Sequence, residues 1–152
     1  MKTSVLEGAS VEPLPGLIRL VPARLVAFDG AGSHGRIPAL SGYRLLAEAG
    51  SGQARQKLFG VVEGALLAVE GARPGAPVSV AVQVVVGRRR FLWETSAQAD
   101  PQGRAWLRVP YATGPNGAAF TSTALVGDGQ ASVEVQVGEA AVLQGLVVPV
   151  SL

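Results

Sequence analysis

The sequence contains no cysteine among its 152 residues. Disulfide bonds and thiolate chemistry are therefore excluded, while the redox state of the compartment stays open. Charged residues are also scarce, at 16% against the roughly 25% that is usual for globular domains. A chain so poor in charge has surface that another domain can cover. The net charge of +2 is small, and it gives little support for nucleic-acid binding.

Long apolar runs are missing as well. No stretch approaches the roughly 18 apolar residues that a membrane-spanning helix requires. The most apolar early segment, 14–28, is interrupted by two prolines, a glycine and two arginines. The N-terminus lacks the charged start and apolar run of a signal peptide. We therefore expect no membrane span in this chain.

Catalytic motifs are equally hard to find. His34 is the single histidine, and it stands among glycines without a second ligand or base at motif spacing. The acidic residues are scattered, and no serine lies in a Gly-x-Ser-x-Gly elbow. Residues 29–32 (Asp-Gly-Ala-Gly) lack the third glycine and the surrounding βαβ unit of a dinucleotide-binding loop, so we interpret them as a turn. The sequence predicts no catalytic residue and no metal site.

What the sequence does contain is alternation in the segment 77–110. Residues 78–86 place five valines on one face, and residues 91–95 and 105–109 also alternate. Asp100-Pro101-Gln102-Gly103 between them fits a type I turn. Strand, turn, strand, turn and strand therefore follow one another. Further strands are expected at the spacing typical of a sandwich, and the full set is 58–62, 66–70, 78–86, 91–99, 105–109, 120–126, 132–137 and 145–150. Residues 138–143 are expected to form a brief helix.

These strands predict a mainly β fold: an antiparallel, immunoglobulin-like or transthyretin-like β-sandwich with a small N-terminal α/β or extended appendage. Residues 17–28 and 38–49 are each expected to be extended or helical. The Gly-Ser-Gly-Gln stretch 50–53 is a flexible break. We therefore divide the chain into a lead-in and small appended unit, 1–52, and a sandwich domain, 53–152.

Two side-chain clusters are candidates for binding. Arg88, Arg89 and Arg90 follow Gly87, where they could grip phosphate or a membrane surface, but we favour a solvated hairpin tip. Trp93, Trp106 and Tyr111 could form a sugar-stacking platform, although aromatic residues in sandwiches are more often core. Trp106 is the best exposed candidate because its face also carries Arg104 and Arg108. The predicted ligand-binding residues are therefore Trp106, Arg104 and Arg108.

Residues 23–30, 42–48 and 57–65 contain three motifs in a fixed order. In this order they resemble segments of the catalytic subunits of archaeal-type membrane oligosaccharyltransferases. Residues 23–30 resemble their Arg-Leu-x-x-Phe-Asp-Gly segment, and residues 42–48 resemble Tyr/Phe-Arg-Leu-x-x-Glu. Residues 57–65 resemble Lys-Val-Phe-Glu-x-Val-x-Gly-Ala, although Phe59-Gly60 departs from the Phe-Glu of the family. The remainder is similar to the β domain that ends those proteins, so that the resemblance covers residues 20–150.

This resemblance implies a C-terminal, extracytoplasmic domain of an enzyme that transfers a lipid-linked glycan to the asparagine of Asn-x-Ser/Thr. The catalytic carboxylates and divalent metal of such enzymes lie in a membrane part, and their acceptor is recognised by a Trp-Trp-Asp-Tyr-Gly motif. Neither is present here, so we expect no activity and no cofactor in this chain. The chain is expected to be such a C-terminal domain, either excised from the enzyme or encoded alone. The implied partners are the membrane-embedded portion of the same enzyme, and an acceptor polypeptide or glycan.

A second resemblance leaves an alternative open. The β portion also resembles carboxypeptidase-regulatory-like or transthyretin-like sandwiches, which implies a surface module that binds carbohydrate or protein. That module alone does not account for residues 23–48.

Overall fold

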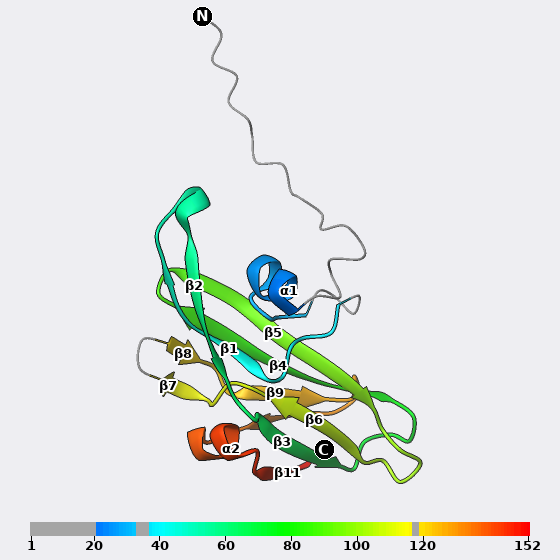
Figure 1. The fold of residues 1–152 in the computed structure, drawn as a ribbon. Helices are drawn as coiled ribbons and strands as arrows, with labels where there is room; N and C mark the ends of the chain where they lie inside the picture. The colour runs from blue at the N-terminus through cyan, green and yellow to red at the C-terminus, as the bar shows by residue number, and fades with distance from the viewer. Residues whose placement is uncertain (1–20, 33–36, 117–118) are drawn as a thin grey trace, which may run out of the picture.

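The valine-rich segment forms the centre of the molecule, as its alternation predicts. The structure is a computed structural model, and it describes residues 21–32, 37–116 and 119–152. The fold is mainly β (Figure 1). In chain order the elements are α1 (Val21–Phe28), β1 (Tyr43–Ala49), the 3-10 helix η2 (Gly52–Ala54), β2 (Gln56–Val61), β3 (Ala65–Glu70), β4 (Pro77–Val86), β5 (Arg89–Gln98), β6 (Ala105–Val109), β7 (Gly114–Asn116), β8 (Ala119–Thr121), β9 (Ala124–Gly127), β10 (Ser132–Val135), α2 (Glu139–Gln144) and β11 (Val147–Ser151).

The core lies between two sheets. β4 pairs with β5 over its full length, and every second residue of β4 points inward. The inward valines are at most 2% exposed, and Trp93 of β5 is fully buried beside them. Across the core, β3 and β6 contribute alternate buried residues from a separate three-stranded sheet. Each of these four strands therefore buries one face against the core and turns the other face outward, which is the pattern of a sandwich.

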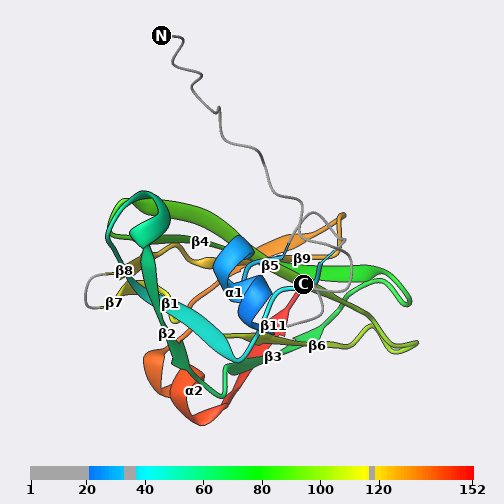
Figure 2. The same cartoon turned by 45° about the horizontal axis from the view of Figure 1, so that its top comes forward.

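The direction of one strand departs from the prediction. The larger sheet has the order β10–β9–β4–β8–β7 with β5 on β4, and all its pairs are antiparallel. The smaller sheet has the order β11–β3–β6, and in it β11 runs parallel to β3. The expectation of a purely antiparallel fold is therefore wrong at this pair. Helix α2 precedes β11 and reverses the chain, so that the last strand returns alongside β3 (Figure 2).

The expected strand 120–126 is divided into two. β8 pairs with β4 at Val84–Val86, whereas β9 pairs with it at Ser79–Ala81. Ser122 lies between them, and its hydroxyl accepts the N–H of Gln83 at 3.0 Å while its own N–H donates to the Gln83 carbonyl. A serine side chain thus replaces one backbone partner and interrupts the ladder. β7 was not predicted from the sequence.

The N-terminal half contains a helix and a hairpin. α1 realises the helical alternative for the end of the segment 17–28, and the segment 38–49 contains a strand, β1. β1 and β2 pair as an antiparallel hairpin, which we call the arm, and it projects beyond the larger sheet (Figure 1). The arm spans the predicted boundary at residues 52 and 53, which stays a prediction. Residues 1–20, which include the predicted lead-in at 1–16, lie outside the described residues.

A β-bulge in the arm explains one feature of its sequence. The register shifts between Leu45 and Ala47, so Leu46 has no partner across the hairpin. A side chain at Gly60 would meet Leu46 Cδ1 at 3.1 Å. Glycine at this position, where the resembling family has glutamate, therefore leaves room for the leucine of the bulge.

Candidate functional site

Trp106 lies on the outer face of the three-stranded sheet. In β6 the residues alternate, with Ala105, Leu107 and Val109 buried. Trp106 is 51% exposed, as predicted. It stands opposite Ala68 of β3, which in turn stands opposite Pro149 of β11. The residues in register with the indole across the sheet are therefore uncharged.

Arg104 is fixed against this indole by the turn that precedes β6. Its guanidinium carbon lies 5.7 Å from the ring centroid of Trp106, within the range of a cation–π contact. Asp100 holds the arginine in place, because its Oδ2 accepts from Nε at 3.0 Å and its Oδ1 accepts from the backbone N–H at 2.8 Å. The backbone hydrogen bond from Arg104, more than any other contact, lowers the pKa of the Asp100 carboxyl. The turn therefore presents a positioned cation beside an aromatic ring.

Arg108 shares the outward face but points elsewhere. Its Nη1 donates to the carbonyls of Glu63 and Gly64 at 2.8 and 2.9 Å, just before β3 begins. Its guanidinium is therefore occupied in joining β6 to the start of β3. Of the three predicted ligand-binding residues, the structure brings Arg104 and Trp106 together and turns Arg108 away. Their binding role itself stays a prediction.

The other two aromatic candidates belong to the core. Trp93 is fully buried, and Tyr111 is 3% exposed, with ring centroids 6.3 Å apart in an edge-to-face arrangement. The Tyr111 hydroxyl accepts the N–H of Leu45 at 2.9 Å. Burial raises the pKa of the Tyr111 phenol well above its usual value. A platform of all three aromatic residues is therefore not formed.

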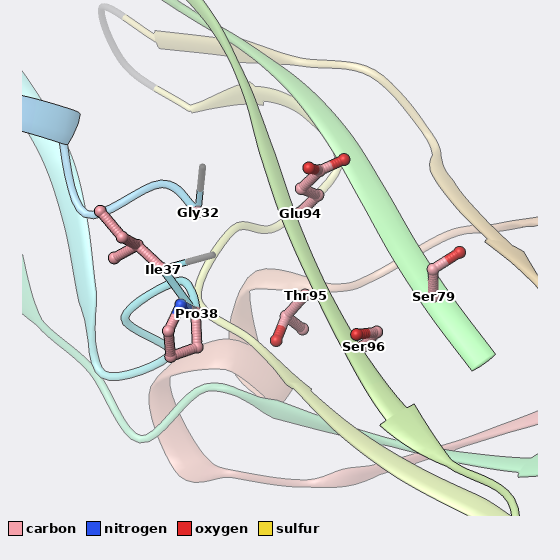
Figure 3. Close-up of a pocket in the computed structure, with 7 residues that line it drawn as sticks. All are labelled: Gly32, Ile37, Pro38, Ser79, Glu94, Thr95 and Ser96. Atoms are coloured by element: carbon pink, nitrogen blue, oxygen red, sulfur yellow. The ribbon is translucent and has the colours of Figure 1, made fainter. Parts of the chain in front are cut away.

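A cleft of about 460 Å³ runs beside β5. Its lining consists of Gly32, Ile37, Pro38, Ser79, Glu94, Thr95 and Ser96. Figure 3 shows Ile37 and Pro38 on one side of β5 and Ser79 on the other. The lining offers hydroxyl groups and one carboxylate, Glu94. These groups can form hydrogen bonds to a polar ligand, but a lone carboxylate lacks the second group that paired acid–base chemistry uses.

Asp29 is the centre of an ion-pair cluster that sequence reasoning missed. It is 3% exposed and lies in the turn after α1, as the turn interpretation of 29–32 anticipates. Its Oδ1 is 2.6 Å from Lys57 Nζ of β2, and its Oδ2 accepts from Arg89 Nε of β5 at 2.6 Å. Glu48 of β1 adds contacts to Arg89 and Arg55. The cluster joins the helix turn and the arm to the β4–β5 hairpin.

This cluster corrects the interpretation of the arginine run in part. Arg88 and Arg90 are exposed, as expected of a solvated hairpin tip. Arg89 instead points back into the cluster, where its side chain is 28% exposed. The alternation of β5 could have signalled this difference, because neighbouring residues of a strand face opposite ways.

A second ion pair joins the arm to α2. Arg44 Nη1 and Nη2 donate to the two carboxylate oxygens of Glu139 at 2.8 and 2.6 Å. The pair lines a groove of about 300 Å³ together with Tyr111 and Thr121. Nothing in the spacing of two residues 95 positions apart indicates such a contact.

Within the described ranges 21–32, 37–116 and 119–152, no cluster of three or more His, Asp or Glu residues is arranged to hold a metal ion. No helix in the same ranges has the length and apolar character to cross a membrane. His34 lies outside the described residues.

Comparison with known proteins gives one family and one recurrent fold. The sequence model of the archaeal glycosylation protein B long peripheral domain matches residues 64–148, which is more than half of the chain. This range runs from β3 into β11 and includes Trp106. No curated protein matches the chain.

Solved structures from Archaeoglobus fulgidus have a similar fold. The oligosaccharyltransferase in complex with zinc and sulfate matches with a TM-score of 0.71 and 15% identity, over 86% of this chain and 24% of that one. The oligosaccharyltransferase AglB in complex with an inhibitory peptide and a dolichol-phosphate matches with a TM-score of 0.72 and 15% identity, over 86% and 22%. The enzyme tethered to an acceptor peptide with the NVT sequon gives 0.57 and 19%, over 63% and 11%. The chain thus spans less than a quarter of the length of these proteins.

Proposed function

This chain belongs to the family of the archaeal glycosylation protein B long peripheral domain, and on that basis we propose that it serves protein N-glycosylation as a non-catalytic, extracytoplasmic domain of an oligosaccharyltransferase. The family match over residues 64–148 carries the proposal, and the shared fold extends it to 86% of the chain. The resemblance to archaeal-type oligosaccharyltransferases noted in the sequence is confirmed by both findings.

The proposed role is structural or substrate-facing. Its partners would be the membrane-embedded portion of the same enzyme, and an acceptor polypeptide or glycan. The described surfaces offer binding groups suited to this role: a cation stacked beside an exposed indole, and a cleft lined by hydroxyl groups. Catalysis and its divalent metal would belong to the membrane part. The immunoglobulin-like or transthyretin-like type of the sandwich also stays a prediction.

A transfer assay tests the non-catalytic role. The purified 152-residue chain is incubated with a lipid-linked oligosaccharide, a divalent metal and a fluorescent Asn-x-Thr peptide, and glycopeptide is measured by a gel shift. We expect no product from the chain alone, and product from membranes that contain the full-length enzyme of the same genome. Measurable transfer by the chain alone would contradict the proposal. A gene without any multi-span membrane segment upstream, or in a neighbouring gene, would favour the carboxypeptidase-regulatory-like alternative.

The exposure of Trp106 favours a second, more specific function at the same domain. An indole that stands above Ala68 and Pro149 offers a flat apolar surface, and the nearby Arg104 supplies hydrogen-bond donors. This combination suits a sugar ring or an extended polypeptide. We infer that Trp106 and Arg104 contact the glycan or the acceptor, with Arg108 supporting the strand beneath them.

Binding measurements with matched variants test this inference. Glycans and sequon peptides are titrated into the isotope-labelled chain, and amide shifts are followed by NMR. Trp106→Ala is expected to weaken binding several-fold without loss of the folded spectrum. Phe120→Ala is the control, because Phe120 has a similar exposure, 55%, on the other sheet. Equal effects of the two substitutions, or no binding by the unchanged chain, would contradict the inference that Trp106 and Arg104 contact the glycan or the acceptor.

A further inference from the structure

Basic side chains gather where the arm meets the turn between β4 and β5. Glu48 lies between Arg55 Nε at 3.4 Å and Arg89 Nε at 3.6 Å, so the two arginines flank one carboxylate. Arg88 and Arg90 adjoin Arg89 in the turn and at the start of β5. Figures 1 and 2 both place this turn beside the arm. We call this region the arginine end; its cations are Arg55, Lys57, Arg88, Arg89 and Arg90.

The arginine end has a large surplus of positive charge. Five cations are balanced by only two carboxylates, Asp29 and Glu48, so the surplus of three exceeds the +2 of the entire chain. The carboxylates are shielded, with side chains 3% and 19% exposed. Among the residues that the structure describes, Arg88 and Arg90 form no ion pair. The charge that reaches solvent here is therefore almost purely positive.

Apolar side chains are exposed next to these arginines. Val85 of β4 stands opposite Arg90 on one side and opposite Phe120 on the other, so all three share the outer face of the larger sheet. Leu92 follows Arg90 on the same face of β5. Phe120 is 55% exposed and Leu92 is 52% exposed. An aromatic and an aliphatic side chain thus border the positive charge.

We propose that the arginine end is a contact site for the surface of an anionic lipid bilayer. Arginines attract anionic headgroups, and exposed Phe and Leu side chains enter the boundary between headgroups and acyl chains. Arg88 and Arg90 lie at the end of a hairpin, where they face outward rather than converge on a cavity. This arrangement fits an extended charged surface better than a single small anion. The contact would hold this end of the domain against the membrane.

Vesicle sedimentation tests the proposal on the 152-residue chain. The probes are vesicles of phosphatidylcholine with phosphatidylglycerol, and vesicles of phosphatidylcholine alone. We expect binding only to the first, with weakening as the salt concentration rises. Because each arginine near such a surface contributes a factor of about five in affinity, Arg88→Gln with Arg90→Gln is expected to weaken binding about 25-fold. Leu92→Ser with Phe120→Ser is expected to remove the binding that persists at high salt.

The control removes the same charge from the opposite end of the hairpin. Arg73 lies before the start of β4, about 30 Å away from Arg88 along this ten-residue strand. Arg73→Gln is expected to bind as the unchanged chain does, whereas Arg88→Gln alone is expected to weaken binding about five-fold. Thermal unfolding checks that every variant is folded. The proposal is overturned if Arg73→Gln and Arg88→Gln weaken binding equally, if neither does, or if phosphatidylcholine alone is bound as well. Binding of pyrophosphate without any vesicle binding also overturns it. None of these outcomes depends on glycan transfer.

Discussion

Asp29 Oδ2 accepts a 2.6 Å hydrogen bond from Nε of Arg89, 60 positions further along the chain. The same carboxylate binds Lys57 through its other oxygen, at 2.6 Å. Three separate segments, namely the turn after α1, the arm and the β4–β5 hairpin, therefore meet at one buried carboxylate. The family match begins at residue 64. This cluster is thus a main attachment between the family domain and the part of the chain that precedes it.

Substitution of Asp29 by asparagine is expected to destabilise the fold by about 3 kcal/mol. Asparagine keeps the size of the side chain, and it tolerates the positive φ of 57° at this position, so the change isolates the charge. Lys57 and Arg89, with side chains 11% and 28% exposed, would lose their shared anion. Removal of one partner from a buried ion pair is strongly destabilising for this reason. Urea unfolding followed by tryptophan fluorescence measures the loss.

Glu48→Gln serves as the comparison for that measurement. Glu48 is more exposed, and its contacts to Arg55 and Arg89 are longer, at 3.4 and 3.6 Å. Its loss is expected to cost less than about 1 kcal/mol. If both substitutions cost the same, the cluster is not centred on Asp29.

The sequence predicted the elements of this fold far better than their attachments. The period-two pattern of residues 78–86 and 105–109 identifies β4 and β6 because it reports which residues face the core. The burial of alternate residues can be predicted without knowing which strand is the partner. The contact of Asp29 with Arg89, and that of Arg44 with Glu139, depend instead on how distant segments meet. Local spacing has no information on such contacts.

The candidate site was likewise predictable only in part. The outward direction of Trp106 followed from alternation, and its exposure is confirmed. The position of Arg104 beside the ring depends on the Asp100 turn, whose residues were recognised but whose hydrogen bonds were not. Arg108 was grouped with Trp106 by the same alternation, yet its guanidinium is turned away because it donates to the carbonyls of Glu63 and Gly64. Alternation assigns a face to a side chain and leaves its direction along that face undetermined.

Tyr111→Phe is expected to destabilise the chain by about 2 kcal/mol. The phenol oxygen accepts the N–H of Leu45, and Leu45 is 1% exposed. Without the hydroxyl this N–H is buried without a partner, and it loses hydrogen bonds that it would form with water in the unfolded chain. Urea unfolding near neutral pH measures the change. Tyr43→Phe, at a half-buried residue of the same strand as Leu45, is the control and is expected to cost less.

The stability of the fold at alkaline pH should also depend on the Tyr111 hydroxyl. Burial raises the pKa of Tyr111 in the folded state above the value of about 10 for an unfolded chain. Its contribution to stability is therefore complete below about pH 10 and is lost as pH rises further, because only the unfolded chain releases the proton easily. The denaturation midpoint of the unchanged chain should fall above pH 10, and that of Tyr111→Phe should fall less steeply. Parallel slopes for the two proteins would contradict this assignment.

Asp128→Asn is expected to reduce the acid sensitivity of the fold. Asp128 Oδ1 accepts the backbone N–H groups of Ala131 and Gln130, each at 2.9 Å, and Oδ2 accepts that of Arg73. These bonds, with the Ala131 bond foremost, hold the pKa of the Asp128 carboxyl far below its usual range. The stabilisation is present above the unfolded pKa of about 3.9 and is lost as pH falls below it. Denaturation midpoints measured from neutral to acid pH should decline less in the variant.

Asp100→Asn completes that experiment. The pKa of Asp100 is also lowered, through the backbone N–H of Arg104 and contacts of its side chain. The double variant should therefore show a flatter acid limb than Asp128→Asn alone. An unchanged acid limb in both variants would show that other carboxylates govern unfolding at low pH.

Gly103→Ala is expected to disrupt the turn that positions Arg104, whereas Gly75→Ala is not. Both glycines have positive φ, +75° and +70°, so alanine at either costs about 1 kcal/mol from the backbone alone. At Gly103 the added Cβ would lie 2.2 Å from the carbonyl oxygen of Ala72, but at Gly75 nothing lies within 4 Å. The Gly103 carbonyl also accepts the N–H of Ala72, so the two turns cannot separate without loss of that bond.

Unfolding of Gly103→Ala should therefore need roughly 2 kcal/mol less than that of Gly75→Ala, the difference being the clash. Because the displaced turn holds Asp100, the resonances of the Trp106 indole should shift in Gly103→Ala and stay in place in Gly75→Ala. Equal stabilities and unshifted indole resonances would mean that the turn relaxes around the new methyl group, and that Trp106 does not depend on it for its position.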